Sequence, residues 1–88
     1  MIVRAEEILI DNGYENITIF KNPSYNNALI GVSNDNRAIY DYDKMIECLI
    51  KEEGFSEIDA MEWIEYNTIR CLSYVGTNSP IVMYPLIK

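Results

Sequence analysis

Residues 38–72, AIYDYDKMIECLIKEEGFSEIDAMEWIEYNTIRCL, decide the fold, because a strand pattern there runs directly into two helical patterns. In the first helical pattern the apolar side chains recur at helical spacing and share one stripe: Met45, Ile46, Leu49 and Ile50. Asp43 is a suitable N-cap, since its carboxylate can accept a bond from a free backbone N–H, and Gly54 can end the helix in the left-handed conformation. We expect a helix over about 44–53.

A second helix is expected over about 57–71. Ser56 and Asp59 have the S-x-x-[DE] spacing of a capping box at its start. Its predicted buried arc contains small and apolar residues: Ala60, Met61, Ile64, Thr68, Cys71 and Leu72. The connection at 54–56 is so short that the two helices must meet at a sharp angle or form an antiparallel hairpin, with Phe55 between them.

The remaining elements follow from local composition. A helix is expected over about 3–12, and strands over about 17–21, 28–33, 38–42 and 81–84. The turn residues at 34–36 predict a hairpin between the second and third strands, and Pro80 and Pro85 confine the last strand to a sheet edge. The order α-β-β-β-α-α-β, in a single domain over 1–88, predicts an α+β fold. We expect a three- or four-stranded antiparallel sheet with the helices packed on one face.

The charge is strongly asymmetric. The chain has 14 acidic and 7 basic residues, a net charge of −7. Residues 41–65 hold nine of these acids and two lysines, so that segment carries the whole net charge of −7. Such a field repels nucleic acid phosphates and anionic lipid, and it attracts basic protein surfaces. We therefore expect no direct binding to nucleic acid or membranes. A membrane span or a signal peptide is not apparent either, which predicts a cytoplasmic protein.

The sequence does not indicate an enzyme. It contains no His, which excludes the Ser-His and Cys-His nucleophile arrangements, and it has no P-loop or dinucleotide motif. We expect no cofactor. Asp41 and Asp43, with Asp35, are the metal-binding candidates, but a helix cap at Asp43 and an exposed strand residue at Asp41 explain the pair without a metal. Cys48 and Cys71 are expected to be free thiols, with Cys48 on the polar side of its helix and Cys71 on the buried arc.

The second helix also carries the candidate binding surface. Acidic and aromatic residues are concentrated there: Asp59, Glu62, Trp63, Glu65 and Tyr66. Trp and Tyr are enriched in binding surfaces, so Trp63 is a candidate interface anchor. The alternative interpretation is structural, with Trp63 sealing the edge of the core and the charged side chains simply solvated.

Four stretches carry a resemblance to a known group of proteins: NGYEN, ALIGVSNDNRAIYDYDKMIE, EIDAMEWIEYNTIR and PIVMYPL. Together they resemble short uncharacterised proteins of bacteriophages, mobile elements and gut Firmicutes, over nearly the whole chain. Those proteins typically have Gly at the position of Asn36 and Met at that of Phe55. The resemblance implies no activity and no catalytic residue. It implies a small accessory protein of a phage or integrated element.

Charge and resemblance together give the leading hypothesis, a non-enzymatic interaction protein that binds a basic site on a partner. It could inhibit a nucleic-acid-binding host defence complex by mimicking the phosphate backbone, as an anti-CRISPR protein would. A second hypothesis is an assembly module that forms a symmetric homodimer through the edge strand 81–84 or through the flank of Trp63. A third is a carboxylate-dependent metal enzyme, built on Asp41 and Asp43.

Overall fold

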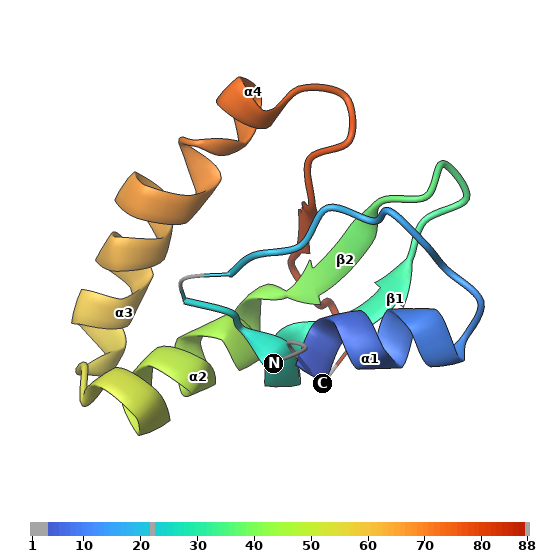
Figure 1. Ribbon diagram of the computed structural model, residues 1–88. Coiled ribbons are helices and arrows are strands. Elements are labelled where there is room, and N and C mark those ends of the chain that lie inside the picture. The colour runs from blue at the N-terminus through green and yellow to red at the C-terminus, as the bar shows by residue number, and fades with distance from the viewer. Residues whose placement is uncertain (1–3, 22, 88) are drawn as a thin grey trace.

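The computed structural model describes residues 4–21 and 23–87, and it has the predicted α+β class (Figure 1). Its elements follow one another in this order: α1 (Arg4–Asp11), the 3₁₀ turn η1 (Asn26–Ala28), β1 (Leu29–Val32), β2 (Ala38–Asp41), α2 (Tyr42–Glu53), α3 (Glu57–Ile64), the π-helical turn η2 (Glu65–Ile69), α4 (Leu72–Val75) and β3 (Ile81–Met83). The predicted start of the first helix, at residue 3, lies outside the described residues. Among the described residues, no helix is both long and apolar enough to cross a membrane.

The sheet is mixed, with strand order β1-β2-β3. The β1–β2 pair is the predicted antiparallel hairpin, and its turn contains Asn36 at a left-handed φ of 62°. In contrast, β3 pairs with β2 in parallel, with Ile39 beside Ile81 and Asp41 beside Met83. The prediction of a purely antiparallel sheet is therefore corrected. The chain leaves the end of β2, crosses through the helices and re-enters beside the start of β2, and this kind of connection produces parallel pairing.

The predicted strand over 17–21 does not form. These residues have no ladder partner, although their trace is extended (Figure 1). The sheet contains only β1, β2 and β3 among the described residues, and this segment lies over it instead of within it. Phe20 fixes it there, because its backbone N–H donates to the Tyr40 hydroxyl at 3.2 Å and its ring packs on Tyr40 and Tyr25.

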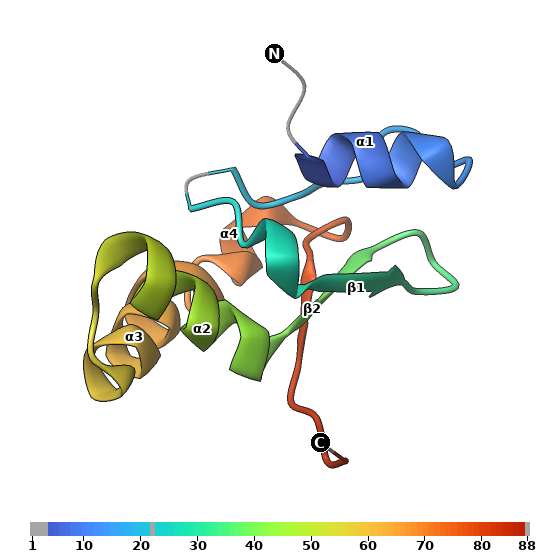
Figure 2. The ribbon, with the colours of Figure 1, turned by 90° about the horizontal axis from the view of Figure 1, so that it is seen from below.

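The core lies on one face of β2. Ala38 and Tyr40 alternate with the less buried Ile39 and Asp41, as expected for a strand with one covered face. The cluster around these two side chains includes residues of η1, α2 and α3: Ala28, Met45, Cys48, Leu49, Ala60 and Ile64. The two central helices thus pack on the same face of the sheet. α1 lies apart from them in both views (Figures 1 and 2).

The connection between α2 and α3 is as short and as sharp as predicted (Figure 1). Gly54 ends α2 at a left-handed φ of 71°, and the Ser56 side chain accepts a hydrogen bond from the Asp59 N–H at 3.1 Å. The N-cap of α2 is Asp41, not Asp43, because the Asp41 carboxylate accepts from the Lys44 N–H at 3.1 Å. The helix therefore begins at Tyr42, two residues earlier than expected.

The second predicted helix is not continuous over 57–71. After Ile64 it widens into the π-helical turn η2, where Thr68 is buried and its hydroxyl bonds to the Tyr25 hydroxyl at 2.8 Å. Tyr25 itself adopts a left-handed φ of 49°, which is strained for a bulky residue. Its burial and this bond hold it in place. The buried pair therefore ties η2 to the segment that precedes η1.

Candidate functional site

One side of α3 carries a shallow hollow that collects most of the predicted binding residues. Asp59, Glu62, Trp63 and Tyr66 line it, at the spacing that places residues on one helical face. Phe55 and Asn67 complete the lining, and the hollow has a volume of about 350 Å³. We call these six residues the acidic hollow.

The side chains of the acidic hollow differ in burial. Asp59 and Glu62 are exposed, and Tyr66 is 62% exposed. Trp63 is half-buried and packs against the core, so it forms a fixed wall. Its environment is thus the one expected for a Trp that seals the core edge, while the same ring borders the hollow. The hollow combines two carboxylates with three aromatic rings, those of Phe55, Trp63 and Tyr66.

Glu65 lies elsewhere. It does not line the acidic hollow, and its carboxylate acts on Tyr42 at the start of α2. Burial raises the pKa of the Tyr42 hydroxyl, and the charges of Tyr84, Glu65 and Asp43 raise it further. Glu65 follows Asp59 by six positions, a spacing that puts the two residues on different faces of a helix.

A cation already lies on one aromatic ring of the hollow. The guanidinium carbon of Arg70 is 5.3 Å from the centroid of the Tyr66 ring, within the range of a cation–π contact. The i, i+4 spacing of Tyr66 and Arg70 was the sequence signal for it. This contact demonstrates that the ring accepts a guanidinium group. The exposed carboxylates of the hollow supply charge-assisted hydrogen bonds for a further one.

The predicted metal candidates are not brought together. The Asp41 carboxylate is used as the cap of α2, and Asp35 accepts from the Ser33 hydroxyl and lies 3.9 Å from the Arg37 guanidinium. Within residues 4–21 and 23–87, no group of three acidic or cysteine side chains is arranged to hold a metal ion.

The two cysteines exchange the environments predicted for them. Cys48 is buried in the core and Cys71 is exposed, and both are free thiols. Burial raises the pKa of the Cys48 thiol, and the carboxylate of Glu52 raises it further. Cys48 therefore stays protonated at neutral pH, the state in which a thiol is a poor nucleophile.

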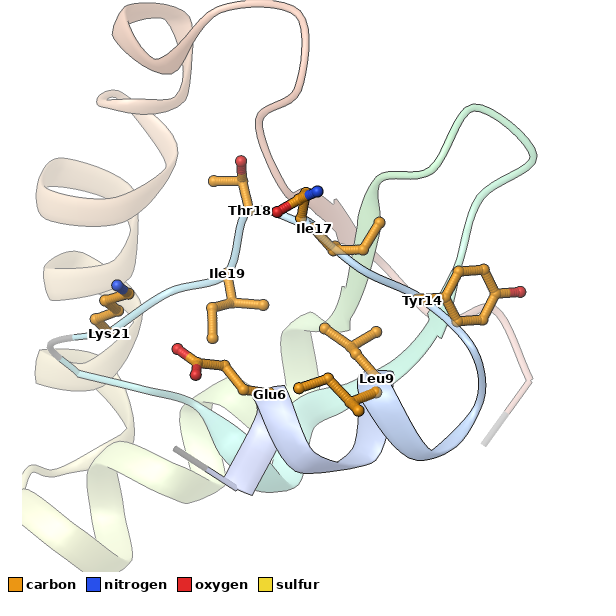
Figure 3. Close-up of a pocket in the computed structure, with 9 residues that line it drawn as sticks. Glu6, Leu9, Tyr14, Ile17, Thr18, Ile19 and Lys21 are labelled. Atoms are coloured by element: carbon orange, nitrogen blue, oxygen red, sulfur yellow. The ribbon is translucent and has the colours of Figure 1, made fainter. Parts of the chain in front are cut away.

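A second concavity, which the sequence did not indicate, lies between α1 and residues 14–21. It has a volume of about 400 Å³. Figure 3 shows Leu9, Ile17 and Ile19 pointing toward one another across this groove, with the Glu6 carboxylate at its border. Thr18 also lines the groove, and its side chain points away from that of Ile19 (Figure 3). Leu9, Ile17 and Ile19 make the inside of the groove apolar, and Glu6 makes its border polar. The lining residues form no catalytic arrangement of side chains.

Comparisons with protein-family models, with curated proteins and with solved structures gave no significant match.

Proposed function

We propose that this protein is a non-enzymatic interaction module that binds a basic site on a partner protein through the acidic hollow of α3. The observation that carries the proposal is the position of two exposed carboxylates beside Trp63 and Tyr66 in one hollow. Carboxylates and aromatic rings are the groups that bind Arg and Lys side chains. The half-buried Trp63 supplies a rigid wall, and rigid aromatic residues are the usual anchors of such interfaces.

The charge around the hollow extends the attraction beyond direct contact. Most of the acids between 41 and 65 are exposed on α2, on α3 and at the start of η2: Glu47, Glu52, Glu53, Glu57, Asp59, Glu62 and Glu65. With a net charge of −7 on the chain, this field steers a basic partner toward the helices and falls off within a Debye length, about 8 Å at physiological salt. Binding is therefore salt-sensitive.

The proposed partner is a protein whose basic surface normally binds nucleic acid. Carboxylates on an exposed helix can occupy cationic sites that would otherwise contact phosphates. The resemblance to phage and mobile-element proteins supports an accessory protein that inhibits a host nucleic-acid-binding defence complex in this way. This protein would then compete with DNA for the basic surface of its partner.

The test compares two charge reversals on the same helical stretch. Glu62→Lys reverses a charge inside the acidic hollow, and Glu65→Lys makes the same change outside it. We expect the wild type to retain a basic protein from a host lysate at low salt and release it at moderate salt. Glu62→Lys should weaken retention by about tenfold or more, since a close charge pair contributes on the order of 1.5 kcal/mol or more. Glu65→Lys should weaken it much less.

The captured protein is then identified and assayed directly. It should bind DNA, and the wild type should displace that DNA while Glu62→Lys should not. If both variants lost retention equally, the net charge of the protein alone would account for binding of the partner. The acidic hollow would then have no specific role. Retention that survives Glu62→Lys would overturn this surface as the binding site.

A further inference from the structure

The extended residues 17–21, hereafter the 17–21 segment, carry unpaired backbone. Within the described ranges, none of the backbone–backbone hydrogen bonds outside the regular elements involves a residue from 15 to 21. The segment is held from the inside by the bond from the Phe20 N–H to the Tyr40 hydroxyl. It thus has the β-branched composition of a strand and the open backbone of a sheet edge, without a partner.

The direction of the Phe20 bond defines a free edge. In extended backbone, successive N–H groups point to opposite edges. Since the Phe20 N–H points inward to Tyr40, the N–H groups of Ile17 and Ile19 point to the opposite edge. That edge offers the N–H and C=O groups of both isoleucines. Thr18 is exposed between them, and its side chain points away from that of Ile19 (Figure 3).

The sequence around this edge is self-complementary. Residues 17–19 read ITI, with two isoleucines placed symmetrically about Thr18. If two copies align antiparallel with Thr18 facing Thr18, Ile17 faces Ile19 of the second copy. The pairing is confined to the extended residues after Asn16, because Asn16 adopts a left-handed φ of 60° and the chain bends there.

Backbone direction and side-chain pattern give the same register. In an antiparallel pair, residues whose N–H and C=O groups face the partner exchange two hydrogen bonds, and the residues between them do not. The free edge requires Ile17 and Ile19 to be the bonded residues, and a two-fold axis through Thr18 allows that arrangement. We propose that the 17–21 segment is a self-association edge, through which two copies of this chain pair antiparallel about Thr18.

Charge and apolar area favour a second copy as the occupant of this edge. Two chains of net charge −7 repel each other, but the negative sum lies within residues 41–65 and the remainder of the chain is neutral. Ile10, which lines the adjoining groove, is 56% exposed and provides further apolar surface. The interface differs from the β3 edge and the Trp63 flank considered from the sequence. The dimer is isologous, as most homodimers are.

Sedimentation equilibrium under reducing conditions tests the proposal. We expect the average mass of the wild type to rise with concentration from 10.2 kDa toward twice that value. Thr18→Glu places two carboxylates against each other on the two-fold axis and should weaken association at least ~10-fold. Thr77→Glu makes the same change at another exposed position and should associate like the wild type.

Amide exchange tests the register itself. Ile17 and Ile19 should become protected as concentration rises, while Thr18 should not. A wild type that stays at 10.2 kDa at millimolar concentration, or a dimer that survives Thr18→Glu, would overturn the proposal.

Discussion

Replacing Ile64 with alanine is expected to destabilise the folded protein by about 2–5 kcal/mol. Ile64 is fully buried at the end of α3 and belongs to the cluster that joins α3 to α2 and β2. Its truncation removes buried apolar surface and leaves a cavity in a close-packed interior. Urea unfolding followed by circular dichroism measures the change.

Ile58→Ala is the matched control for this substitution. Ile58 lies on the same helix and is 69% exposed, so its truncation should change the free energy of unfolding by no more than about 0.5 kcal/mol. The two variants lose the same side-chain atoms, so the difference between their free energies of unfolding measures the effect of burial. Similar losses in both variants would contradict the placement of Ile64 in the core and of Ile58 on the surface.

The stability of the protein is expected to fall steeply between pH 10 and pH 12. Burial raises the pKa of Tyr25 from 10.0 to about 12, against a smaller lowering by its hydrogen bond to Thr68. In this window the folded protein keeps the Tyr25 proton and the unfolded chain has lost it, so the unfolded state binds fewer protons and stability decreases as pH rises. Below pH 10 both the folded and the unfolded chain keep the Tyr25 proton, so the buried tyrosine contributes its full stabilisation there. The loss is about 1.4 kcal/mol per pH unit, and Tyr40, whose pKa burial also raises, acts in the same direction.

Urea unfolding at a series of alkaline pH values tests this prediction. Tyr25→Phe should be less stable than the wild type at neutral pH, because the Thr68 hydroxyl loses its partner. Its stability should nevertheless fall less steeply above pH 10. Tyr66→Phe removes an exposed hydroxyl and controls for the substitution itself. If Tyr25→Phe and the wild type had parallel curves, the buried tyrosine would not be the source of the pH dependence.

The two proposals combine into one arrangement. Pairing through the 17–21 segment would leave the acidic hollows of both copies available, since none of the hollow's residues belongs to that segment. A dimer of this kind would present two binding surfaces to a partner with repeated basic sites. Linked binding of this kind raises affinity through effective concentration without any new contact. Thr18→Glu should then weaken capture of such a partner while leaving each acidic hollow intact.

The candidate site could be predicted only in part. Helical spacing placed Asp59, Glu62, Trp63 and Tyr66 together, because residues at i, i+3, i+4 and i+7 share a face in any regular helix. Glu65 lies outside the hollow because it follows Asp59 by six positions, which puts it on another face of the helix. The π-helical turn η2 was not predicted, and it accompanies a bond between Thr68 and Tyr25, residues 43 positions apart, which no local pattern contains.

The sequence by itself determined the elements whose cause is local. Ser56 fixes the start of α3 through a hydrogen bond with a neighbouring residue. Gly54 ends α2 through its left-handed backbone conformation. Apolar periodicity likewise identified both helices, and the turn residues at 34–36 identified the β1–β2 hairpin. The concentration of charge in 41–65 is a property of composition, and it defines the acidic character of the surface before any fold is known.

Only the tertiary structure decided which neighbours these elements have. The buried stripe of α2 contains Cys48, while Ile50 is partly exposed, because the packing of η1 and α3 selects which side of an amphipathic helix is covered. Tertiary packing also decided that β3 pairs in parallel with β2 and that the 17–21 segment has no strand partner. A strand's local sequence specifies an extended backbone, but the strand that it pairs with is decided by the packing of distant segments of the chain.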